Sequence, residues 1–134
     1  MLLVVLSAFL SGLSQHSIGL DSIVFITIIP LIHILNNNLT FKKSIKVGFL
    51  WGFFYTLTTI YWLAFNIGVT QTIGMISMIS AVLFLTLNYI FIILLYYFFR
   101  EILSIRTLFI LPTIWVSVEY LRSFFALGFP WISL

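Results

Sequence analysis

The length of its apolar runs most constrains how this chain can fold. Several runs exceed the roughly 18 to 20 residues that the hydrocarbon core of a bilayer demands. A soluble domain in which 63% of the residues are hydrophobic and 7% are charged would have almost nothing polar to place on its surface. The sequence therefore predicts an integral membrane protein.

The spanning elements are expected to be helices. Backbone groups in lipid must bond to one another, which leaves helices or closed barrels, and barrel strands alternate polar and apolar residues. Runs such as Ile90–Phe99 do not alternate. We therefore predict an all-α, polytopic transmembrane helical bundle of about five helices, which forms one unit over residues 1–134. The predicted helices cover residues 2–13, 22–35, 47–65, 75–99 and 108–126.

Two details qualify these helices. Pro30 should kink the second helix or end its regular hydrogen bonding, because proline has no N–H. Gly48 and Gly52 have the GxxxG spacing that lets another helix approach closely.

The basic residues predict the orientation. With five helices, five of the six Lys and Arg residues fall on one side, namely Lys42, Lys43, Lys46, Arg100 and Arg106. The positive-inside rule makes that side cytoplasmic, so the N-terminus is also predicted to be cytoplasmic. The link over residues 66–74 and the end of the fifth helix then face outward.

Several kinds of chemistry lack candidate residues. The net charge of +3 is small and dispersed, which argues against a nucleic-acid partner. The chain has no cysteine, so it offers no disulfide, thiolate nucleophile or cysteine-ligated metal. No His, Asp and Glu residues have metal-ligand spacing, and no nucleophile and base form a pair. We therefore predict no catalytic residue, no metal site and no cofactor within this chain.

Glu119 and Arg122 are the main candidates for a functional site. They lie three residues apart, on one face of a helix that also carries Trp115. A charged residue at a helix centre costs about 2.5–3.5 kcal/mol in lipid, so the pair should face protein or water. Arg122 could offer its planar fork to a phosphate or carboxylate while Glu119 holds it in place. The alternative is an interfacial ion pair that Arg122 relieves by snorkelling outward.

Two aromatic clusters fall on the same predicted side. The turn Gly128-Phe129-Pro130-Trp131 should present two rings in a set direction, since Pro130 fixes φ and biases Phe129 towards an extended backbone. Tyr61-Trp62 lies near the outward end of the third helix. Each cluster alone is also typical of an aromatic belt at a membrane surface.

The last 21 residues, Ile114–Leu134, resemble the W-x3-E-[WY]-L-R…GFPW motif of apolipoprotein N-acyltransferases. The matching residues are Trp115, Glu119, Tyr120, Leu121, Arg122, Gly128, Phe129, Pro130 and Trp131. The layout upstream, with a short N-terminal hairpin, a basic loop and a helix that ends in Tyr61-Trp62-Leu63, is also similar to that family.

The resemblance implies a fold and an activity. In that family an N-terminal membrane bundle carries a periplasmic nitrilase-like domain, whose Glu-Lys-Cys triad moves an acyl chain from a phospholipid to the amino group of a diacylglyceryl-cysteine. The implied partners are the phospholipid donor, the lipoprotein and the bilayer, and the implied location is the bacterial inner membrane. The implied substrate-binding residues are Glu119, Arg122, Phe129, Pro130, Trp131, Tyr61 and Trp62.

This chain ends before the nitrilase-like domain would begin and has no cysteine. It is therefore expected to be a fragment of the enzyme that is inactive alone. The alternative is a non-enzymatic small membrane protein, such as a transporter half, an assembly partner or a lipid-binding scaffold. A transporter would place polar groups near mid-membrane on several helices, whereas the third and fourth helices are almost wholly apolar.

Overall fold

A computed structural model describes residues 1–16, 24–37, 39–103 and 107–124. Helices are the only regular elements in its described part, which confirms the predicted all-α bundle. The helices are α1 (Leu2–Ser14), α2 (Val24–Thr27), α3 (Ile29–Asn36), α4 (Phe41–Ile60), the 3-10 helix η2 (Tyr61–Phe65), α5 (Gln71–Leu103) and α6 (Thr107–Ser123). They correspond to the five expected segments, with the second segment divided and the third continued into η2.

The second segment divides at Ile28, between α2 and α3. Pro30 occupies the first turn of α3, where its missing N–H matters little. The same missing donor interrupts any continuous helix through this point. The range 22–35 expected for one helix is therefore two short helices, of 4 and 8 residues.

Two helices begin several residues earlier than expected. The third segment was placed from residue 47, but α4 begins at Phe41 because Thr40 caps it, and Thr40 Oγ1 accepts a hydrogen bond from the Lys43 amide at 3.3 Å. The lysines therefore lie on the helix instead of in the preceding loop. The fourth helix, placed at 75–99, extends as α5 from Gln71 to Leu103.

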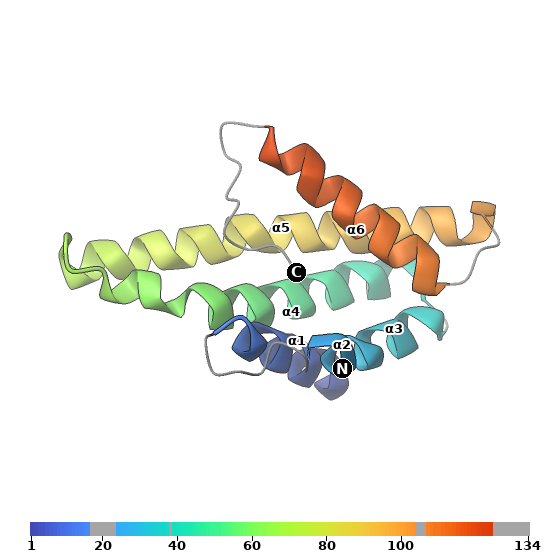
Figure 1. Cartoon of the computed structure of the whole chain (residues 1–134), viewed down its shortest axis with the longest axis horizontal. Coiled ribbons are helices and arrows are strands. Elements are labelled where there is room, and N and C mark those ends of the chain that lie inside the picture. The colour runs from blue at the N-terminus through green and yellow to red at the C-terminus, as the bar shows by residue number, and fades with distance from the viewer. Residues whose placement is uncertain (17–23, 38, 104–106, 125–134) are drawn as a thin grey trace.

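An antiparallel hairpin of α4 and α5 forms the centre of the bundle (Figure 1). The GxxxG glycines make this packing possible. A Cβ on Gly48 would lie 2.7 Å from the Ile90 Cα, and one on Gly52 would lie 2.8 Å from the Tyr89 Cβ. The predicted close approach of another helix is thus confirmed. α1 packs against α4, whereas α6 crosses the hairpin and packs against α5 and α3.

The basic residues gather at one end of the hairpin. Arg100, near the end of α5, donates from Nη2 to the carbonyl oxygen of Leu39 at 2.9 Å and lies over the Tyr97 ring at 5.2 Å. Lys43 Nζ donates to the carbonyl oxygen of Asn37 at 3.0 Å. We call this the basic end, and we call the opposite end, formed by η2 and residues 66–80, the hairpin tip. In Figure 1 the tip extends beyond α1 and α6.

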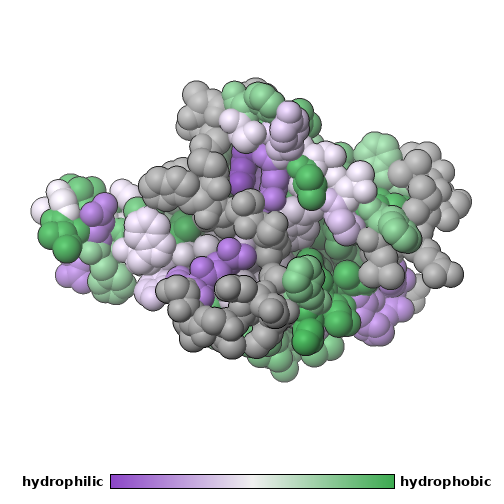
Figure 2. Space-filling model, viewed as in Figure 1, coloured by the Kyte–Doolittle hydropathy of each residue, from purple (hydrophilic) through white to green (hydrophobic). Residues whose placement is uncertain are grey.

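Two of the described helical segments, Phe41–Phe65 and Gln71–Arg100, are long and apolar enough to cross a membrane. α1 has 13 residues, which span only about 20 Å. Much of the outer surface is apolar, as Figure 2 shows for the face over α1 to α3. Examples on α1 and α2 are Leu2, Phe25 and Ile26, which are 72%, 77% and 66% exposed.

Candidate functional site

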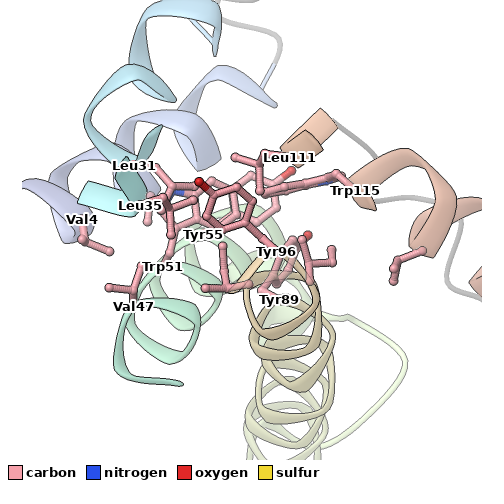
Figure 3. Close-up of a cluster of buried hydrophobic side chains, with 14 of the residues drawn as sticks. Val4, Leu31, Leu35, Val47, Trp51, Tyr55, Tyr89, Tyr96, Leu111 and Trp115 are labelled. Carbon is pink, nitrogen blue, oxygen red and sulfur yellow. The ribbon is translucent and has the colours of Figure 1, made fainter. Parts of the chain in front are cut away.

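Four large aromatic side chains from three helices meet in the core. Trp51 and Tyr55 come from α4, Tyr89 from α5 and Trp115 from α6, and Figure 3 shows them side by side. Trp51 stacks on Tyr55 at 4.8 Å between ring centroids and meets Trp115 edge-on at 5.0 Å. Tyr89 lies 5.3 to 5.4 Å from each of the other three rings. We call these four residues the aromatic cluster.

Trp51 is held in place from the α1 side. Its indole Nε1 donates to Ser7 Oγ at 3.2 Å, and Ser7 Oγ in turn donates to the carbonyl oxygen of Thr27. Ser11 Oγ and Thr27 Oγ1 share a further hydrogen bond of 2.7 Å. Since all of these groups are buried, the bonds satisfy donors and acceptors that would otherwise be costly to bury, and they fix the orientation of the indole.

Trp115 is held from the opposite side by the predicted acid. Its Nε1 donates to Glu119 Oε1 at 2.9 Å, one helical turn further along α6. Leu111, Trp115 and Val118 form the buried stripe of this helix, and Arg122 continues it one turn beyond Val118. Glu119 and Arg122 are therefore half-buried on the protein-facing side of α6.

The acid and the base lie near the tyrosines of the aromatic cluster. The charges of Glu119 and Arg122 are within electrostatic range of the hydroxyls of both Tyr55 and Tyr89. We call these four residues the polar junction. Because Tyr55 and Tyr89 are buried, these interactions are screened less than they would be in water. The junction combines an acid, a base and two phenols from three helices.

The other predicted site residues are not brought to this junction. Tyr61 and Trp62 lie in η2, which packs against α5 and α4, whereas α6 packs against α5 and α3. Both are exposed, by 49% and 44%, and the Tyr61 ring lies edge-on to His16 at 5.4 Å. Phe129, Pro130 and Trp131 lie outside the described residues. The described part of the chain holds no group of three His, Asp or Glu residues that suits a metal.

Sequence reasoning missed Trp51, Tyr55 and Tyr89 as members of one cluster with Trp115. Their signal in the sequence is indirect. Trp51 and Tyr55 have a four-residue spacing that aligns them on α4, and Gly52 lies within that stretch. Trp51 and Tyr55 each lie three residues after a glycine of the GxxxG pair, so the face that admits a neighbouring helix also carries these bulky side chains.

Residues 7–134 match the family described as the apolipoprotein N-acyltransferase N-terminal domain. The chain is similar to the apolipoprotein N-acyltransferase of Wigglesworthia glossinidia brevipalpis, with 33% identity over 115 residues that cover 81% of this chain and 23% of that protein. It is also similar to that of Geobacter metallireducens, with 31% identity over 139 residues that cover 99% of this chain and 26% of that protein. The chain thus spans about a quarter of the length of these relatives.

No solved structure matches the chain. The family assignment therefore depends on the sequence relatives and the family match, which includes both Glu119 and Arg122. The chain belongs to the apolipoprotein N-acyltransferase family, of which it represents the N-terminal domain.

Proposed function

We propose that this chain is the membrane part of an apolipoprotein N-acyltransferase, an enzyme that transfers an acyl chain from a phospholipid to the N-terminal diacylglyceryl-cysteine of a lipoprotein. The family match over residues 7–134 carries this proposal. The chain contains no cysteine, so a thioester step would use a thiolate that this chain does not supply. Its own role is to bind and position substrates, and it binds phospholipid without turning it over.

In this proposal residues 1–134 form one bundle that crosses the bacterial inner membrane several times. The lengths of Phe41–Phe65 and Gln71–Arg100 support a spanning role for the hairpin. The basic end faces the cytoplasm, in accord with the positive-inside rule. The N-terminus lies on the same side, and the hairpin tip faces outward.

The polar junction receives the lipid headgroup. Arg122 has five N–H donors in a planar fork, which is more than one carboxylate accepts at once. Glu119 is oriented by Trp115 Nε1 and balances the charge of Arg122, so that the pair is tolerated inside the bundle. A phosphate is the group that best suits such a fork. Tyr61, Trp62, Phe129, Pro130 and Trp131 contact acyl chains at the outward surface.

Native mass spectrometry of the 134-residue chain in detergent micelles tests this role. The wild-type chain should retain phospholipid, and Arg122→Gln should weaken binding roughly ten- to hundredfold, the range for lost hydrogen bonds to a charged acceptor. Lys46→Gln is the control, since Lys46 is an exposed cation at the basic end. Phospholipid retention that is unchanged by Arg122→Gln, or lowered equally by Lys46→Gln, would contradict the proposal.

The same chain also distinguishes the non-enzymatic alternative. In a second experiment, this chain replaces the N-terminal domain of an acyltransferase from the family, either fused to the remainder of that enzyme or co-expressed with it. Acyl transfer by the combination should then depend on Arg122. A lipid-binding scaffold would bind phospholipid through Arg122 but would support no acyl transfer in any such combination.

A further inference from the structure

Tyr55 has a buried hydroxyl without a hydrogen-bond partner. Its side chain is 0% exposed, and its Oη bonds to no group in the described part of the chain. The hydroxyls of Thr59 and Tyr89 are close enough to interact with the Tyr55 hydroxyl, but neither reaches the distance and angles of a full hydrogen bond with Tyr55 Oη. Thr59 Oγ1 instead donates to the backbone carbonyl of Tyr55 at 2.7 Å.

A hydroxyl in this position is unfavourable for the empty protein. Most buried polar groups find a partner, and burial without one sacrifices the hydrogen bonds that water would make. A phenylalanine would fill the same space without this cost. The hydroxyl therefore suggests a partner that is not part of the chain.

The surroundings of Tyr55 indicate what that partner is. The ring is fixed by Trp51 at 4.8 Å and by Tyr89 at 5.4 Å, so the hydroxyl has little freedom to turn elsewhere. Arg122 and Glu119 act electrostatically on this hydroxyl from α6. A ligand near Arg122 that carries several acceptor oxygens in a small volume would meet a fixed O–H donor from α4 as well as the guanidinium.

We infer that Tyr55 is a further substrate-positioning residue of the polar junction, whose hydroxyl donates a hydrogen bond to an oxygen of the phosphate that Arg122 binds. This inference rests on the proposed function. The phosphate belongs to a lipid headgroup or to a free phosphate ester, which share the same oxyanion chemistry. Two donors on different helices would fix the orientation of the phosphate more completely than the planar fork of Arg122 does alone.

Tyr55→Phe tests the inference in the 134-residue chain, because it removes only the hydroxyl. Titration with a short-chain phosphatidylethanolamine in detergent, followed by tryptophan fluorescence, should show a roughly ten- to hundredfold weaker Kd, as expected for a lost hydrogen bond to a charged acceptor. The Tm of the lipid-free protein should stay the same or rise. Tyr96→Phe is the matched control, since Tyr96 is also a buried tyrosine of the hairpin, at 2% exposure, and it should leave the Kd unchanged.

Arg122→Gln separates the failure of this inference from failure of the proposed function. Weaker binding in Arg122→Gln together with an unchanged Kd in Tyr55→Phe would overturn the role of Tyr55 alone. Unchanged binding in both variants would overturn the proposed function. A Tm of Tyr55→Phe that falls by several degrees without lipid would show a structural hydroxyl and would also overturn the inference.

Repeating the titration with inorganic phosphate and with glycerol 3-phosphate identifies the source of the phosphate. A headgroup site should bind the lipid much more tightly than either soluble probe. Equal affinity for the soluble probes, still lowered by Tyr55→Phe, would support the hydrogen bond and assign the site to a free phosphate ester.

Discussion

The two halves of the α4–α5 hairpin are both apolar, yet their side chains have very different surroundings. In the inner half, Trp51, Tyr55 and Tyr89 are at most 2% exposed and belong to one cluster with buried residues of α1, α3 and α6. At the hairpin tip, Phe65 and Ile67 are 71% and 101% exposed. Hydrophobicity alone therefore does not locate the core of this chain. The inner half is distinguished by the neighbouring helices that cover it, whereas the tip extends beyond α1 and α6 (Figure 1).

Removal of a large side chain should separate the two halves most clearly. Trp51→Ala should lower the free energy of unfolding by about 3–5 kcal/mol, because it empties a site at the centre of the aromatic cluster. Phe65→Ala, an aromatic truncation at the tip, should change it by less than about 0.5 kcal/mol. Thermal and chemical unfolding in detergent micelles measure both. Equal losses would mean that the tip is packed as tightly as the inner half.

A methyl group on a glycine should give the next largest difference. Gly48→Ala places a Cβ 2.7 Å from the Ile90 Cα, a backbone atom that cannot yield without separating α4 from α5. The expected cost is about 1–3 kcal/mol. Gly68→Ala is the control. Apart from its chain neighbours, the nearest heavy atom to the added Cβ would be Asn66 Oδ1, at 4.0 Å. A stability of Gly48→Ala close to that of the wild type would show that the hairpin has room at this contact.

Loss of one buried hydroxyl should have a smaller effect. Ser7→Ala leaves Trp51 Nε1 without its acceptor and removes the bond to the Thr27 carbonyl. We expect the free energy of unfolding to fall by about 1–2 kcal/mol, with a change in tryptophan fluorescence as the indole is released. Ser80→Ala, on the exposed surface of α5, should do neither. Unaltered fluorescence in Ser7→Ala would argue against this anchor.

The smallest effect is expected at the basic end. Arg100→Gln removes a hydrogen bond to the Leu39 carbonyl and the cation–π contact with Tyr97, at a cost of about 0.5–1.5 kcal/mol. Lys46→Gln, which removes an exposed charge, should be near zero. A larger loss in the free energy of unfolding for Arg100→Gln would show that a specific contact holds the basic end. Equal small losses in both variants would mean that only the overall charge matters.

Much of the fold follows from the sequence because apolar runs of this length have one local solution, the helix. The errors lie at boundaries. Lys42, Lys43 and Lys46 suggested a loop, but Thr40 caps the helix before them and their charges reach the surface from its first turns. The break at Ile28 agrees with the prediction that Pro30 would kink the second helix or end its regular hydrogen bonding, although the range 22–35 was expected to be one helix.

The site was only partly predictable for a related reason. Glu119 and Arg122 are conspicuous, because charges within an apolar segment are costly wherever they face lipid. Tyr55 and Tyr89 are not conspicuous, since aromatic residues suit lipid, interface and core alike. Only the contacts between α4, α5 and α6 distinguish these positions from exposed aromatics such as Tyr61 and Trp62.

Impermeant thiol labelling most directly tests whether the hairpin crosses the membrane with its basic end inside. The chain has no cysteine, so Thr70→Cys at the tip and Lys42→Cys at the basic end each give a single reactive site. A maleimide that does not cross membranes, added to intact spheroplasts, should label Thr70→Cys and reach Lys42→Cys only after permeabilisation. The reverse pattern, or equal labelling of both before permeabilisation, would contradict the proposed orientation.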